Sequence, residues 1–261
     1  MTLPDSPPRP QTETQTAPQK AIGTIYGVGL GPGDPELMTV KADRLLRAAR
    51  HVAYFRKVGR KGQARQIVEG LIPDSAVEWP MEYPVTTEIP LTDPHYNRTL
   101  AGFYETCTQS LRDLAAGGAD VAVLCEGDPF FYGSFMHLYM RLADQVPVEV
   151  VPAITGMSAA WTATGAPITW GDDVLTVLMG TLPEDDLARR MAQTDALVVM
   201  KIGRNIDKVR RALQASGRYG EAWLVEYAAM PGQTVARLAE VEAETLPYFS
   251  IILVHGRGRR P

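Results

Sequence analysis

A glycine-rich stretch near the N-terminus constrains the fold of this chain more than any other feature. Residues 27–35 read Gly-Val-Gly-Leu-Gly-Pro-Gly-Asp-Pro, follow the apolar run 24–26 and precede a segment with helical spacing from Met38 to Arg50. A strand, a tight turn and a helix in this order place a backbone loop at the carboxyl edge of a parallel sheet, where α/β proteins bind ligands. The stretch therefore predicts a ligand-binding loop.

Two common phosphate-binding motifs do not fit this loop. No Gly-Lys-Ser/Thr follows it, which excludes a P-loop. The third glycine of a dinucleotide fingerprint would fall at Pro32. The predicted strand from His51 to Phe55 is followed by Arg56 and not by the acidic residue that would bind a ribose hydroxyl.

Composition narrows the classes of function. The chain has 261 residues, 45% of them hydrophobic, and a net charge of −4, which gives a nucleic-acid-binding role no overall electrostatic support. Cys107 and Cys125 lack paired-ligand spacing and the four histidines are scattered, so we expect no disulfide framework and no metal site. No run is apolar enough for a membrane helix, and a reducing cytoplasm fits the cysteine usage.

The two ends of the chain are predicted to be unstructured. Residues 1–20 hold five prolines and few large apolar groups, and they lack the apolar core of a secretory signal. We expect a disordered tail there and a frayed, solvated basic tail at 257–261.

Three segments between the first strands stand out. Residues 56–65 are basic, and they form either a solvated face or a clamp for an anionic ligand. Residues 78–94 carry four prolines, which predicts a long loop of the kind that often serves as a lid or a binding loop. An apolar stripe from Tyr96 to Leu114 predicts a helix that packs on the core.

The strand–loop–helix pattern occurs twice more in the first part of the chain. The predicted strand 119–125 is followed by the loop Glu126–Ser134, and the strand 148–151 by the loop Pro152–Ser158. Because the carboxyl ends of parallel strands meet at one edge, we expect the three loops to converge there. Their small residues allow backbone groups to approach a ligand closely.

The pattern then starts again, which predicts a second domain. Strands are expected at 174–179, 196–201, 222–227 and 249–254, and helices at 184–193 and 206–215. The predicted organisation is α/β, with two consecutive α/β domains at 21–167 and 168–256, mixed or parallel sheets, and an active-site cleft between them.

In this order the motifs resemble the tetrapyrrole methylase family, the class III S-adenosylmethionine-dependent methyltransferases. The resemblance spans residues 22–256. It is carried by Val28–Pro35 with Leu37 and Thr39, by Gly127-Asp128-Pro129 with Tyr132-Gly133, by Pro152-x-Ile154-Thr155-x-x-Ser158, and by Lys201 with Asn205. Ala153 departs from the family pattern, which usually has glycine there.

The resemblance implies S-adenosylmethionine as cofactor, bound in the cleft, and a homodimer. The residues that it implies for cofactor binding are Pro32, Glu126, Gly127, Asp128, Phe131, Tyr132, Thr155, Gly156, Lys201, Ala228 and Ala229. For the anionic tetrapyrrole we expect Asp34, Arg56, Lys57, Arg60 and Lys61. Other interpretations stay open for Asp34 as a turn residue, for Tyr132 as a packing residue and for Lys201 as a surface charge.

Within the family, the Glu126-Gly127-Asp128 motif and the Met81–Thr86 loop are most similar to the branch that methylates carbon 20 of precorrin-2 in cobalamin biosynthesis. The alternatives are the cobalt-containing substrate, uroporphyrinogen III, or another tetrapyrrole. From a different class, a non-catalytic nucleotide-binding module is an alternative. The only carboxylates that the motifs place near the cleft as candidate bases are Asp34 and Glu126, and no catalytic residue is assigned.

Overall fold

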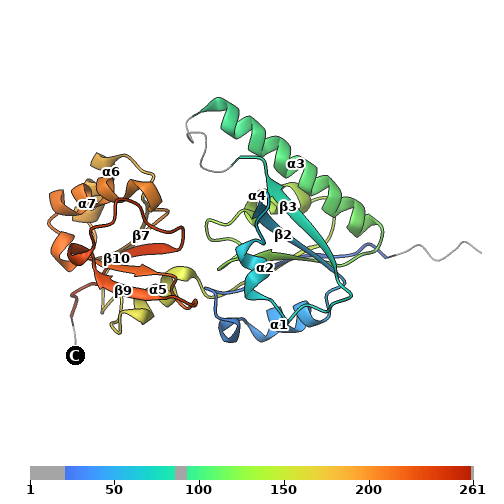
Figure 1. Cartoon of the computed structure of the whole chain (residues 1–261), viewed down its shortest axis with the longest axis horizontal. Helices are drawn as coiled ribbons and strands as arrows, with labels where there is room; N and C mark the ends of the chain where they lie inside the picture. Colours follow the sequence, from blue (N-terminus) through green and yellow to red (C-terminus); the bar gives the residue numbers. More distant parts are fainter. Residues whose placement is uncertain (1–20, 86–92, 260–261) are drawn as a thin grey trace, which may run out of the picture.

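The computed structural model describes residues 21–85 and 93–259, and it contains two five-stranded sheets (Figure 1). The first sheet has the order β3-β2-β4-β1-β5. Its strands are β1 (Ile25–Gly29), β2 (His51–Lys57), β3 (Val77–Tyr83), β4 (Val121–Cys125) and β5 (Val148–Val151). All pairings are parallel, so the carboxyl ends of the strands lie at one edge.

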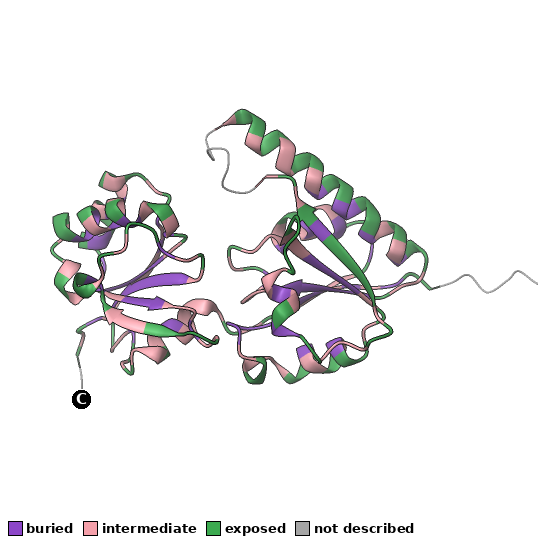
Figure 2. Ribbon diagram, viewed as in Figure 1, coloured by how far each residue is buried: buried purple, intermediate pink, exposed green. Residues whose placement is uncertain are grey.

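Helices cover both faces of this sheet, which explains why β4 is buried along its whole length (Figure 2). The long helix α3 (Pro94–Ala116) and the helix α4 (Phe135–Leu142) pack on one face, through residues such as Leu111 and Phe135. On the other face α1 (Val40–Arg47) and the short α2 (Gln63–Ile67) contribute Leu46 and Ile67.

The second sheet is mixed and has the order β6-β7-β10-β8-β9. Its strands are β6 (Leu175–Met179), β7 (Ala196–Met200), β8 (Trp223–Glu226), β9 (Thr234–Arg237) and β10 (Ser250–Val254), and only β6 and β7 run parallel. The helices α6 (Glu184–Ala192) and α7 (Ile206–Ala215) pack on one face, and α5 (Gly156–Ala163) on the other. Short 3₁₀ turns lie at Pro35–Leu37, Gly203–Asn205, Tyr219–Glu221 and Leu238–Glu240.

The predicted α/β class with two sheets is confirmed, and most of the predicted elements are present. The expectation of a loop throughout 78–94 is wrong at both ends, because β3 continues to Tyr83 and α3 begins at Pro94, and residues 86–92 lie outside the described part. Pro80 is compatible with this strand because β3 lies at the edge of the sheet. Strand β9 was not foreseen. The boundary at residue 167 stays a prediction, although Ala160 of α5 already packs with the second sheet.

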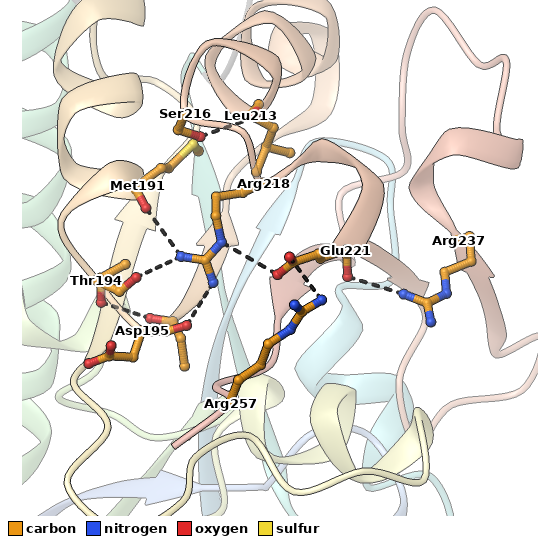
Figure 3. A network of polar contacts seen from close by, with 10 residues as sticks. Met191, Thr194, Asp195, Leu213, Ser216, Arg218, Glu221, Arg237 and Arg257 are labelled. Atoms are coloured by element: carbon orange, nitrogen blue, oxygen red, sulfur yellow. Dashed lines mark hydrogen bonds and ion pairs between the residues drawn. The ribbon is translucent and has the colours of Figure 1, made fainter. Parts of the chain in front are cut away.

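The C-terminal segment is held by a polar network (Figure 3). Arg218 donates hydrogen bonds to the backbone carbonyls of Met191, Thr194 and Asp195, and Arg257 pairs with Glu221 at 2.9 Å. The amide of Gly258 also donates to the Asp173 carboxylate. The expected fraying therefore does not extend to these residues, although the Arg257 side chain is well exposed; residues 1–20 and 260–261 lie outside the described part.

Candidate active site

Three loops meet at the carboxyl edge of the first sheet, as the sequence predicts. Gly31 and Gly127 form an antiparallel bridge between the loops that follow β1 and β4. The side chain of Asp128 joins the second loop to the third, because its Oδ2 accepts a hydrogen bond from Ala153 N at 2.9 Å while its Oδ1 accepts one from Phe130 N. Ala153 does not have a positive φ, so alanine is accepted at this turn.

The three loops approach one another so closely at Gly29 that only glycine fits there. A Cβ on Gly29 would lie 2.6 Å from the Cβ of Ala153 and 2.9 Å from Pro129 Cδ. No side chain fits at position 29 without moving these neighbours, so the glycine is what allows the three loops to come together.

Four non-glycine residues in the described ranges have positive φ angles: Tyr132 (55°), Lys201 (53°), Tyr227 (53°) and Ala229 (57°). Three of them were predicted as site residues from the family motifs. Such conformations cost about 1–3 kcal/mol each and are concentrated at functional sites. They lie on the loops after β4, β7 and β8.

The half of the chain that holds the first sheet and the half that holds the second sheet make direct contact around these residues. A Cβ on Gly33 would lie 2.3 Å from Met230 Cγ, and the Lys201 ammonium lies 5.8 Å from the centre of the Tyr132 ring. In Figure 1 the loop after β4 faces the second half. A hollow of about 670 Å³ lies beside the contact and has a mostly apolar lining. It is lined by Leu37, Ala153, Ile154, Thr155, Met157, Ser158, Ala159, Thr162, Ala163, Ala229 and Gln233.

The third loop leads into α5 through a capped turn. Thr155 is the N-cap, and its hydroxyl accepts a hydrogen bond from Ser158 N. Gly156 follows and packs near Ile251 of β10 and Gly127 of the second loop. Thr155, Gly156 and Gly127, which were predicted separately, therefore lie side by side.

Glu126 is oriented differently from the other predicted residues. Its Oε1 accepts a hydrogen bond from Ala64 N at the start of α2, a helix whose N-cap, Gly62, has no side chain to do so. Desolvation raises the pKa of Glu126 to about 6, and the hydrogen bond from Ala64 opposes this rise. Glu126 also lies within electrostatic range of Tyr248, which precedes β10.

The predicted anion-binding residues are largely engaged with carboxylates or with backbone. Arg56 pairs with Glu82 at 2.8 Å, and Lys61 with Glu69 at 2.5 Å. One oxygen of Asp34 accepts a hydrogen bond from Glu36 N, which agrees with the turn interpretation. Pro32 is buried in the loop, whereas Lys57 and Arg60 are exposed at the end of β2. The substrate-binding role of this stretch stays a prediction.

Sequence reasoning missed several residues at the same place. Tyr83, from the segment expected to be a loop, shares a short hydrogen bond with the Ser134 hydroxyl, and burial raises its pKa. The His137 ring stacks on Tyr104 at 4.5 Å, and Tyr248 is 76% exposed. One feature of the sequence indicated His137, which follows Ser134 at the end of the second loop by three residues. No feature of the sequence indicated Tyr248.

Two absences apply to the described residues. Between 21 and 259, with 86–92 set aside, no group of three or more His, Cys, Asp or Glu side chains is arranged to hold a metal ion. Over the same ranges no helix is both long and apolar enough to cross a membrane.

Comparison with known proteins agrees with this arrangement. The profile of the family described as Tetrapyrrole (Corrin/Porphyrin) Methylases matches residues 24–242. The chain is 51% identical over 240 residues to a precorrin-2 C(20)-methyltransferase of Sinorhizobium sp., covering 92% of this chain and 98% of that protein. It is 28% identical to a cobalt-precorrin-2 C(20)-methyltransferase of Salmonella typhimurium, covering 89% and 96%.

A solved structure shares the fold as well. The uroporphyrin-III C-methyl transferase from Thermus thermophilus, complexed with S-adenosylhomocysteine, superposes with a TM-score of 0.62 at 28% identity. The superposition covers 89% of this chain and 97% of that one.

Proposed function

The chain belongs to the tetrapyrrole (corrin/porphyrin) methylase family, and on this basis we propose that it methylates carbon 20 of precorrin-2 in cobalamin biosynthesis. S-adenosylmethionine would be the methyl donor, and precorrin-3A and S-adenosylhomocysteine the products. The observation that carries the proposal is the similarity to the Sinorhizobium precorrin-2 C(20)-methyltransferase, which extends over nearly the whole of both chains.

The residues at the loop junction fit the cofactor. S-adenosylmethionine supplies an activated methyl group on a sulfonium, so the protein needs to bind and orient more than to react. The Gly127–Asp128 turn lies beside Thr155 and Gly156, and the hollow next to Ala229 has the size of a small-molecule site. We propose that these residues, with Pro32, Phe131, Tyr132 and Ala228, hold the cofactor.

Catalysis would then depend mainly on positioning. The loops of the first sheet would hold the tetrapyrrole, the cofactor would supply the methyl group in line with the reacting carbon, and contact between the halves would exclude water. A carboxyl group could afterwards remove the carbon-20 proton. We favour Glu126 over Asp34, because desolvation raises the pKa of Glu126 to about 6, whereas Asp34 accepts a hydrogen bond within its own turn.

The cobalt-containing substrate is the second candidate, supported by the lower similarity to the Salmonella cobalt-precorrin-2 enzyme. Incubation with S-adenosylmethionine and precorrin-2, with and without cobalt, tests both. We expect the metal-free substrate to gain the mass of one methyl group. Gain only with cobalt would favour the second candidate, and transfer to neither would contradict both.

We also propose that the enzyme works as a homodimer in the cytoplasm. The family resemblance supports the dimer, and the two free, buried cysteines are consistent with a reducing compartment. Light scattering after size-exclusion chromatography tests the dimer: a mass of twice the chain is expected, and a monomer at micromolar concentration would contradict it.

A further inference from the structure

Two cationic side chains and one histidine gather where the two halves meet. Lys201 follows β7, and His137 and Arg141 occupy successive turns of α4; we call these three residues the cation cluster. Desolvation and then the positive charges of Arg141 and Lys201 lower the pKa of His137, so the three groups lie within electrostatic range of one another.

Aromatic rings fix the positions of these cations. The His137 ring stacks on Tyr104 of α3, and Arg141 lies over the same ring with its Cζ 5.9 Å from the centroid. Arg141 also donates a hydrogen bond to the carbonyl of His137. On the opposite side, the ring of Tyr132 contacts Lys201. The cluster is therefore organised before any ligand arrives.

Little negative charge balances the cluster. Within the described residues its one ion pair joins Arg141 to Glu105 at 3.4 Å, and Glu105 is 67% exposed. Neither Lys201 nor His137 has a carboxylate partner there, and desolvation lowers the pKa of Lys201. The predicted clamp differs, because Arg56 and Lys61 would have to give up Glu82 and Glu69 before binding another anion.

We propose that the cation cluster binds carboxylate side chains of the tetrapyrrole, and that His137 is protonated in that complex. The inference rests on the proposed function, which supplies a ligand rich in carboxylates. It moves Lys201 from the predicted cofactor-binding residues to the substrate-binding residues, and it adds His137 and Arg141 to the latter. Cations that little negative charge balances attract such a ligand even though the whole chain is acidic.

Neutral substitutions test the assignment. His137→Gln and Arg141→Gln should each raise KM for precorrin-2 by about tenfold, the effect of losing one charge-assisted hydrogen bond. KM for S-adenosylmethionine should change less than about twofold. His51→Gln is the matched control, because His51 begins β2 at the opposite edge of the sheet. Arg56→Gln tests the alternative clamp.

The pH dependence separates a binding role from a packing role. Because the pKa of His137 is lowered in the free protein, KM for precorrin-2 in the wild type should already begin to rise below about pH 6.5 as this histidine loses its proton, while the substrate carboxylates stay ionised. The rise should disappear in His137→Gln. The other charged and titratable groups near His137 are the same in the wild type and the variant, so their effects on the pH dependence of KM cancel in the comparison. They are Tyr104, Glu105, Glu126, Arg141 and Lys201.

Equilibrium binding of uroporphyrin, a stable tetrapyrrole with carboxylate side chains, makes the test independent of turnover. Weaker binding by His137→Gln and Arg141→Gln, but not by His51→Gln, supports the cation cluster even if no methyl is transferred to precorrin-2. The inference would be overturned, and the proposed function kept, if the wild type transfers methyl normally and both variants keep the wild-type KM, pH profile and uroporphyrin affinity. A KM effect confined to Arg56→Gln would move the carboxylates to the basic stretch and overturn it as well.

Discussion

Replacing Gly29 with alanine tests whether the three loops depend on close backbone approach. The new methyl group would lie 2.6 Å from Ala153 Cβ and 2.9 Å from both Pro129 Cδ and Val151 O. These atoms belong to the neighbouring loops and to the end of β5, so no flexible side chain can move aside. Overpacking of this kind costs about 1–3 kcal/mol.

The net effect is smaller than the steric cost, because alanine lowers the backbone entropy of the unfolded chain. That gain is about 0.5–1 kcal/mol. Since all three close contacts involve constrained atoms, we expect Gly29→Ala to lose about 2 kcal/mol of unfolding free energy. We also expect at least about tenfold weaker binding of S-adenosylhomocysteine, because the substitution would push apart the loops that we propose as its binding site.

Gly102→Ala provides the matched control. Gly102 lies in α3, and a Cβ there would meet nothing within 4 Å. The same substitution should therefore stabilise the protein by about 0.5–1 kcal/mol and leave cofactor binding unchanged. Urea denaturation and isothermal titration calorimetry measure both quantities. Equal stability and equal affinity for Gly29→Ala and the wild type would refute the reasoning.

Three further predictions concern the polar groups around the site and the second sheet. Asp128→Ala removes the acceptor for Phe130 N and Ala153 N, so the affinity for S-adenosylhomocysteine should fall about tenfold or more. Asp128→Asn keeps one acceptor and should lose less affinity. Equal affinity of the wild type and both variants by calorimetry would contradict this role of Asp128. The raised pKa of Glu126 means that the folded protein binds more protons than the unfolded chain between about pH 4.5 and pH 6, so this carboxyl group lowers stability as the pH rises through that window. Glu126→Gln should therefore gain on the order of 1 kcal/mol relative to the wild type between pH 4.5 and pH 7, and parallel pH profiles in urea denaturation would be the contrary result. Arg218→Met leaves the carbonyls of Met191, Thr194 and Asp195 without their donor and should lower the free energy of unfolding by about 2–4 kcal/mol. Arg211→Gln, which breaks the exposed pair with Glu184, should lower it by less than about 1 kcal/mol. Thermal unfolding shows whether the two variants differ.

The convergence of the loops could be predicted from sequence because it follows from chain connectivity. A strand, a short loop and a helix, repeated along the chain, produce parallel strands whose carboxyl ends share one edge. This placed Gly31, Gly127 and Thr155 correctly beside one another. The pattern does not depend on which distant residues pair, which is why it could be read without a structure.

The missed features depend on contacts between distant residues. The carboxylates of Glu82 and Glu69 neutralise Arg56 and Lys61 only because the chain brings them together, and no local pattern shows this. Strand β3 contains Pro80, which argues against a central strand but is tolerated at an edge. His137 looked like one of four scattered histidines until the fold placed it opposite Lys201.

The identity of the methylated carbon tests the central claim most directly. S-adenosylmethionine labelled with carbon-13 in its methyl group is incubated with precorrin-2 and the purified chain, and the product is examined by NMR. The account predicts a single labelled methyl group bonded to carbon 20. A labelled methyl on any other carbon, or a tetrapyrrole that carries no label, would contradict it.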